Sequence, residues 1–236
     1  MTVLGLRVAP GVAERLGDVL PELIGGLFAG ACQACGREQP PPTDLVVDQP
    51  SGEFALATLH HHACRPSAWH DSGIAAWPRE PYLTYSMGGA VIRFVEDGAD
   101  DVGPVMSAAI VLLNPALEQH VLRRVDGRWV SCGLDFFEAA GLLPPTETDA
   151  GTAVAPHVRA RVTTKTIFLD IEPPSAALRT FNGPVGEEVC RAALQAGRLL
   201  LIATQAVNPI VGHGPVELNT VLTDARARMG WVSVAG

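Results

Sequence analysis

The sequence predicts an α+β fold whose body is rich in mixed and antiparallel strands. Its 236 residues are 47% hydrophobic and 18% charged, which supplies a substantial core and excludes a disordered chain. Segments with the patterns of strands and of helices are both frequent. They do not alternate regularly, as they would in a doubly wound parallel sheet. Together these observations favour an α+β fold.

The N-terminal segment combines a short strand pattern with an apolar helical stripe. Residues 2–8 are strand-like, and apolar side chains then recur between Val12 and Phe28 at intervals of four, three and one residues. Pro21 either kinks this helix or lies in the first turn of a second helix. We expect the stripe to pack in the core; the alternative is a helix that contacts a partner.

Strand patterns dominate the middle of the chain. They cover residues 44–48, 53–59, 90–95 and 105–113. Two interpretations compete after Asn114. Either Asn114 caps a helix over residues 115–124, or residues 120–125 and 128–133 form a hairpin across the two-residue turn Asp126-Gly127. A short helix is predicted at residues 136–143.

The last part of the chain mixes both kinds of element. Strands are predicted at residues 158–164, 166–171, 199–204 and 231–235, and helices at residues 184–198 and 216–229. Residues 144–156 are rich in Pro, Thr, Gly, Glu and Asp, which predicts a linker or mobile loop. We therefore expect a first module in residues 1–88, and α+β segments in residues 89–143 and 157–236 that can pack as one domain.

Charge lowers the expectation of nucleic-acid binding. The net charge is -8; residues 1–118 hold 6 basic and 14 acidic side chains, and residues 119–236 hold 11 of each. Nucleic-acid binders usually present a basic face, and neither half is basic. No stretch of about 20 residues is free of charges and helix breakers, so we expect no membrane span.

Cysteine usage points to a reducing compartment. The five cysteines are an odd number without even spacing, which is a poor disulfide framework. Residues 27–32 faintly resemble a lipoprotein cleavage site. Glu14, Asp18, Pro21 and Glu22 interrupt the segment before them, where an export signal needs an unbroken apolar run. We therefore expect a cytoplasmic protein.

Two pairs of Cys and His residues have the spacing of metal ligands. Cys32 and Cys35 form a C-x2-C pair followed by Gly36, and His61 and Cys64 form an H-x2-C pair after a spacer of 25 residues. Zinc binds four such sulfur and nitrogen donors in a tetrahedron, and a glycine after the first pair permits a tight backbone reversal. Neighbouring His60 and His62 compete with His61 for the third position, because alternate residues of a strand face opposite ways.

Residues 32–67 resemble the C-x2-C…H-x2-C zinc fingers of the treble-clef or zinc-ribbon kind. The resemblance implies that Cys32, Cys35, His61 and Cys64 hold a structural Zn²⁺. Four protein ligands leave no coordination position for water, so hydrolysis at the metal is not expected. A zinc deaminase is disfavoured too, because its H-x-E motif precedes the cysteine pair and no Glu follows any of the three histidines here.

The predicted function is non-catalytic: a zinc-binding protein with a binding, regulatory or structural role, acting through a protein partner or self-association. A thiol redox pair at Cys32 and Cys35 is one alternative. Buried thiols beside surface histidines are another. A third is an enzyme with its active site in residues 106–236, around His213 or Cys132.

Overall fold

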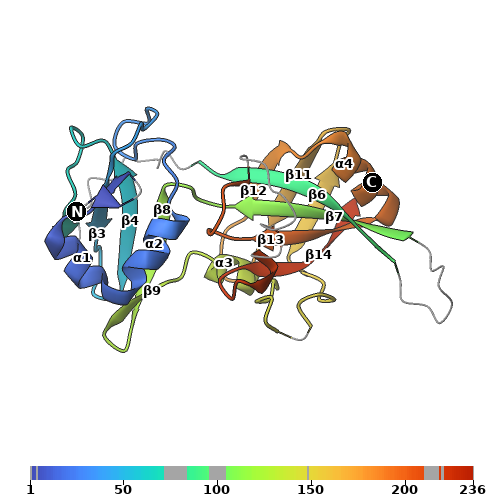
Figure 1. Ribbon diagram of the computed structural model, residues 1–236. Coiled ribbons are helices and arrows are strands. Elements are labelled where there is room, and N and C mark those ends of the chain that lie inside the picture. Colours follow the sequence, from blue (N-terminus) through green and yellow to red (C-terminus); the bar gives the residue numbers. More distant parts are fainter. Residues whose placement is uncertain are drawn as a thin grey trace. The chain divides into compact units, whose positions relative to one another are not determined.

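The computed structural model describes residues 2–3, 5–71, 84–95, 105–147, 149–209, 218 and 221–235. This part of the chain is rich in strands, which form two curled sheets with few helices, as Figure 1 shows. The prediction of a strand-rich body is therefore confirmed. The chain divides into two compact units: unit 1 comprises Met1–Tyr85 and Pro115–Gly133, and unit 2 comprises Ser86–Asn114 and Leu134–Gly236.

Unit 1 combines a sheet with short N-terminal helices. Its described strands are β1 (Thr2–Val3), β2 (Leu6–Arg7), β3 (Thr43–Asp48), β4 (Phe54–His60), β5 (Trp69–His70), β8 (Gln119–Val125) and β9 (Arg128–Ser131). Its described helices are α1 (Pro10–Leu16), the 3-10 turn η1 (Gly17–Val19) and α2 (Leu20–Gly26). Pro21 lies in the first turn of α2, where its missing N–H is tolerated.

The sheet of unit 1 is organised around β3 and β4. Its order is β1-β2-β3-β4-β8-β9, and β5 also pairs with β3. β3 and β4 are antiparallel, with Leu45 opposite Leu59, whereas β2 and β5 run parallel to β3. The chain after β4 therefore turns and returns alongside β3.

The predicted helical stripe forms the core of unit 1. Val12, Leu16 and Leu23 of the helices pack in one buried cluster with Leu59 and Leu122 of the sheet. Leu23 and Leu122 are fully buried. Each buried side chain of this size stabilises the folded state by about 2 kcal/mol. Packing against the sheet therefore holds the helices in place.

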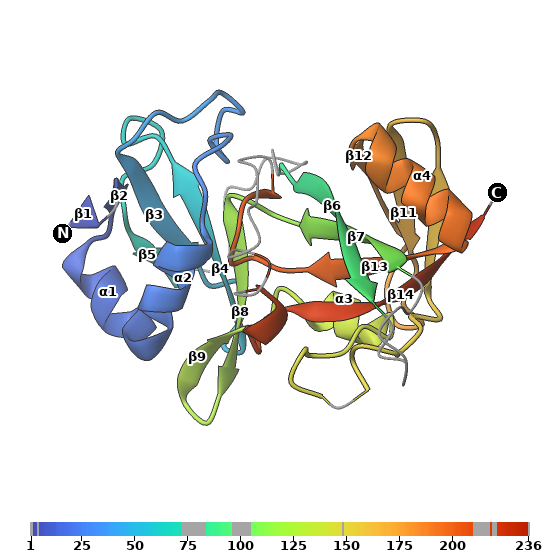
Figure 2. The ribbon, with the colours of Figure 1, turned by 45° about the vertical axis from the view of Figure 1, so that its right-hand side comes forward.

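Unit 2 contains the larger share of the chain. Its described strands are β6 (Ser86–Val95), β7 (Val105–Asn114), β10 (Val158–Val162), β11 (Thr166–Ile171), β12 (Arg179–Pro184), β13 (Arg198–Ala203) and β14 (Arg228–Ala235), and its described helices include α3 (Asp135–Ala139) and α4 (Glu187–Ala196). The strand order is β12-β11-β10-β14-β13-β7-β6, and the pairs β10–β14 and β13–β7 are parallel. Helix α4 packs mainly against β7 and β6, and Figure 2 shows its place in the unit.

Two glycines show how tightly unit 2 is curled. A Cβ on Gly183 of β12 would lie 3.1 Å from the Cβ of Met87 in β6, although these strands are at opposite ends of the strand order. A Cβ on Gly89 would lie 2.9 Å from Val185 Cβ and 3.0 Å from Val189 Cγ1, at the start of α4. Glycine is required where the sheet closes on itself and where the helix covers it.

The hairpin interpretation of residues 120–133 is confirmed, and the helix over residues 115–124 is wrong. β8 and β9 are antiparallel, with Val125 opposite Arg128. Asp126 and Gly127 have φ of 49° and 81°, the positive values of a type I′ turn. This turn matches the twist of the strands, and pairing of β8 with β4 outweighs the local capping signal at Asn114.

Residues 144–156, predicted as a linker or mobile loop, contact β14 in the described structure. Val154 forms a bridge with Trp231, and the Trp231 indole N–H donates to the Gly151 carbonyl at 2.8 Å. Ala150 and Ala155 are buried. The segment is therefore held by backbone pairing, although its own side chains are small or polar.

Two predicted helices are shorter than their patterns suggest. α3 ends at Ala139, because Gly141 has φ of 94°, which is incompatible with continued helix, and Leu143 then pairs with Met229 of β14. The predicted helix at residues 216–229 does not reach Met229, which lies in β14. Within the described residues, no helix is long and apolar enough to cross a membrane.

Candidate metal centre

The first cysteine pair lies in a tight backbone turn. Residues Ala31 and Glu38 form a bridge that closes it, and the Cys32 N–H donates to the Arg37 carbonyl at 2.8 Å. The N–H groups of Cys35 and Gly36 donate to the Cys32 carbonyl at 3.2 and 2.8 Å. Gly36 has φ of 69°, which a glycine adopts without strain. The C-x2-C-G sequence thus folds into a knuckle that presents two thiols together.

The second pair follows the end of β4. This strand ends at His60, and the N–H groups of Cys64 and Arg65 both donate to the His61 carbonyl at 3.0 Å. His61 therefore begins a turn, and strand alternation no longer governs where its side chain points. This turn places His61 and Cys64 on the same side, toward the knuckle.

The structure brings all four predicted residues together. The ligand atoms of Cys32, Cys35, His61 and Cys64 lie within 4.8 Å of one another. His61 Nδ1 is 3.5 Å from Cys35 Sγ and 3.8 Å from Cys64 Sγ. A tetrahedral zinc with bonds of about 2.3 Å to sulfur and about 2.1 Å to nitrogen has ligand–ligand edges of roughly 3.6–3.8 Å. The cluster is therefore compatible with a zinc site.

A backbone contact orients the His61 ring. His61 Nε2 lies 2.8 Å from the Glu38 carbonyl oxygen, which can only accept a hydrogen bond. Nε2 consequently carries the proton, and the lone pair is on Nδ1, the atom nearest the thiols. Metal-binding histidines commonly have such a second hydrogen bond, which fixes the tautomer.

The three consecutive histidines have different surroundings. His60 is buried, and its Nε2 lies 2.8 Å from Thr58 Oγ1. His62 is exposed, and its Nδ1 lies 3.1 Å from Asp44 Oδ1. Only His61 of the three belongs to the metal-compatible group found among the described residues. Burial and the Arg65 charge lower the pKa of His60 to about 4, so His60 is neutral at pH 7.

Buried polar side chains attach the knuckle to the sheet. Gln39 donates from Nε2 to the carbonyls of Ala31 and Leu59 at 2.7 and 2.9 Å. Glu118 is fully buried, and its Oε1 accepts the Ala31 N–H at 2.9 Å. A Cβ on Gly30 would clash with the Glu118 carboxylate, so glycine is needed there. These contacts fix the position of the first cysteine pair relative to β4.

Ion pairs attach the second segment to β3. Arg65 binds Asp48 through two hydrogen bonds of 2.7 Å each, and Asp48 is buried. Asp44, which also contacts His62, accepts a hydrogen bond from the Ser67 N–H at 3.0 Å. Bidentate pairs of this kind fix geometry strongly. Both ligand segments are thus held to the same two strands, β3 and β4.

The thiols differ in exposure and in acidity. Cys32 is fully buried, Cys35 is half-buried and Cys64 is exposed. Burial opposes ionisation of Cys32, but N–H groups directed at its sulfur, including that of His61 at 3.4 Å, lower its pKa to about 7. Desolvation and the neighbouring Cys35 and Cys32 thiols raise the pKa of Cys64 to about 11. A bound cation would oppose this rise in the pKa of Cys64, because its charge stabilises the deprotonated thiol that metal ligation requires.

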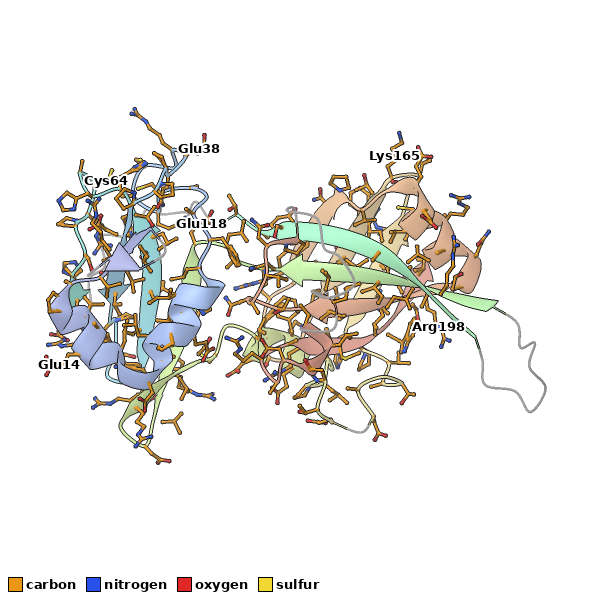
Figure 3. All side chains as sticks on the ribbon, in the orientation of Figure 1. Glu14, Glu38, Cys64, Glu118, Lys165 and Arg198 are labelled. Atoms are coloured by element: carbon orange, nitrogen blue, oxygen red, sulfur yellow. The ribbon has the colours of Figure 1, made fainter. Side chains whose placement is uncertain are left out.

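Figure 3 shows where the site lies in unit 1: Cys64 and Glu38 are near one end of the unit and Glu14 near the other. Sequence reasoning did not find Glu38, Gln39 or Glu118. Glu38 contributes a backbone carbonyl, which any residue type could supply. Glu118 is distant in sequence and reaches the knuckle only through the pairing of β8 with β4. No sequence motif marks either contact.

Cys132, proposed for an enzyme site, does not belong to this cluster. Cys132 is half-buried, and its Sγ contacts the Val121 carbonyl at 3.5 Å. His213 lies outside the described residues. No disulfide involves any of the five cysteines, all of which the structure describes.

No protein-family model, no curated protein and no solved structure matches this chain. The geometry of the cluster is therefore the observation from which a function can be inferred.

Proposed function

We propose that Cys32, Cys35, His61 and Cys64 bind one structural Zn²⁺, and that the protein has a non-catalytic binding or regulatory role. The observation that carries the proposal is the convergence of the four ligand atoms within 4.8 Å. Three thiolates and one imidazole are a donor set typical of structural zinc. Carboxylates, which calcium and magnesium prefer, are not part of the cluster.

A structural role follows from the coordination number. Four protein ligands complete the tetrahedron and leave no position for a water nucleophile. The ligands also come from two chain segments that have 25 residues between them. One ion would join these segments, and structural zinc sites in peptides supply about 10–16 kcal/mol of apparent binding free energy. The metal would therefore stabilise unit 1.

The cluster supports zinc over a dithiol redox pair. A redox pair needs only Cys32 and Cys35, usually at the start of a helix. Here the N–H groups of Cys35 and Gly36 close a turn, and α2 ends at Gly26, before the pair. His61 and Cys64 would have no role in such a pair.

The partner surface would lie outside the metal site. Three exposed apolar side chains, Phe54, Val125 and Val130, lie on β4 and the β8–β9 hairpin. Phe54 is opposite Arg123 in β8, which is opposite Val130 in β9. Exposed apolar side chains grouped on neighbouring strands are typical of interaction sites. Sedimentation analysis of the wild type and of Val130→Ser would show whether this surface mediates self-association.

Metal analysis tests the zinc proposal directly. Protein purified without chelators is expected to contain one zinc per chain by plasma mass spectrometry. Cys35→Ser should lose the metal and lower the melting temperature of unit 1. Cys132→Ser is the matched control, because Cys132 is a half-buried thiol outside the cluster. A metal-free wild-type protein that is folded would overturn the proposal.

A further inference from the structure

The three thiols of the cluster are not equally accessible to solvent. Cys32 is fully buried, Cys35 is half-buried and Cys64 is exposed. The sulfur of Cys32 also accepts the His61 N–H at 3.4 Å, which holds it on the inner side of the cluster. A solute that reacts with sulfur therefore meets Cys64 first and Cys35 second.

We infer that Cys64 is an oxidation site for hydroperoxides, and that a Cys64–Cys35 disulfide then forms and releases the metal. The inference rests on the proposed zinc site and describes its regulation. Susceptibility of thiolates to oxidation follows exposure and thiolate character, and zinc ligation keeps the sulfur as a thiolate.

Cys35 and Cys64 are neighbours within the cluster. The sulfurs of Cys35 and Cys64 lie within 4.8 Å of each other, and each is close to His61 Nδ1, at 3.5 and 3.8 Å. A disulfide requires a sulfur separation of about 2.05 Å. Cys64 is exposed and Cys35 is half-buried, so both are more accessible than the fully buried Cys32.

Two steps complete the chemistry. The Cys64 thiolate attacks the peroxide; a sulfur–oxygen bond forms, the oxygen–oxygen bond breaks, and an alcohol leaves after taking up one proton. The Cys35 thiolate then attacks the Cys64 sulfur; the disulfide forms, the sulfur–oxygen bond breaks, and hydroxide leaves and is protonated to water. Two thiolates are oxidised by two electrons and one hydroperoxide is reduced to alcohol and water.

Oxidation would remove half of the ligand set. Only Cys32 and His61 would remain as donors, which is too few to complete a tetrahedral zinc site. The new disulfide would still join the knuckle to the turn after β4, so the two segments would remain connected without the metal. A thiol reductant with added zinc would restore the original site.

The test uses the zinc-loaded full chain in the Cys132→Ser/Cys190→Ser background, in which every remaining thiol belongs to the cluster. Hydrogen peroxide is added in the presence of a chromophoric zinc chelator, and free thiols are titrated in parallel. The expected result is release of one zinc per chain together with the loss of two thiols. Peptide mass spectrometry should identify a Cys35–Cys64 linkage, and dithiothreitol with zinc should reverse both changes.

Other results would overturn the inference. It fails if zinc stays bound while peroxide is in excess, if the disulfide joins Cys32 and Cys35, or if release follows only irreversible unfolding. The wild-type chain supplies an internal comparison, because buried Cys190 and half-buried Cys132 should remain reduced while Cys64 reacts. The two proposals fail separately: a protein purified without metal contradicts the zinc site, whereas a zinc protein that resists peroxide contradicts only the oxidation.

Discussion

His61 is distinguished from its two neighbours by the hydrogen bonds of its ring. Its Nε2 donates to the Glu38 carbonyl, which directs Nδ1 toward the thiols of Cys35 and Cys64. His60 contacts Thr58 inside the unit, and His62 contacts Asp44 at the surface. Three identical residues in sequence thus have three environments, set by the end of β4 between His60 and His61.

Substitution of His61 should weaken zinc binding, whereas substitution of His62 should not. His61→Ala removes one of four ligands, and we expect zinc affinity to fall by at least about 100-fold, since changes even outside the ligand set cost 10–100-fold. His62→Ala removes only a contact between an exposed ring and Asp44. Competition with a fluorescent zinc chelator measures both variants. Equal loss of affinity in the two would contradict the assignment of His61.

The buried pair of Asp48 and Arg65 should matter more for stability than an exposed pair. The side chains of Asp48 and Arg65 are 4% and 21% exposed. Asp48→Ala leaves the Arg65 charge without its partner, and we expect the unfolding free energy of unit 1 to fall by about 3 kcal/mol. Asp71→Ala is the control: its pair with Arg15 is about half exposed, so we expect a clearly smaller loss of unfolding free energy. Urea denaturation of the two variants gives the comparison.

At the scale of elements, local sequence patterns predicted the structure correctly where a short run of residues determines its own backbone conformation. Asp126-Gly127 specifies a two-residue turn, and Cys35-Gly36 specifies the reversal of the knuckle, so the hairpin and the cysteine pair could be predicted. The pairing of strands that are distant in sequence could not be predicted in this way. The helix signal after Asn114 and the polar composition of residues 144–156 are local, and pairing with β4 and β14 decides both segments.

The turn between β8 and β9 gives a test of backbone conformation with a matched control. Gly127 has φ of 81°, and nothing lies within 4 Å of a Cβ built there, so Gly127→Ala should cost about 1 kcal/mol through backbone strain alone. Gly25 lies in α2 with ordinary φ and equally open space. Gly25→Ala should therefore stabilise by about 0.5–1 kcal/mol. Thermal unfolding curves should shift in opposite directions; a shared direction would contradict the conformational argument.

At the scale of the whole molecule, the two units are interleaved in sequence. Residues 86–114 belong to unit 2, and residues 115–133 return to unit 1 as β8 and β9. The ranges 1–88, 89–143 and 157–236 divide the chain at changes in composition. Composition does not report which strand pairs with which, and the pairing of β4 with β8 is what assigns residues 119–125 to unit 1.

Removal of the metal should therefore loosen unit 1 along both of its chain segments while unit 2 stays folded. The proposed ligands lie entirely in unit 1, and the buried clusters around Leu59 and around Ile202 belong to different units. After chelation, amide hydrogen exchange should accelerate most at residues 31–67 and also at β8, which pairs with β4 and carries no ligand. Exchange in β10–β14 is the internal control and should not change. Acceleration confined to residues 31–67 would show that the ion orders only a local loop, and equal acceleration in both units would show that they do not unfold separately.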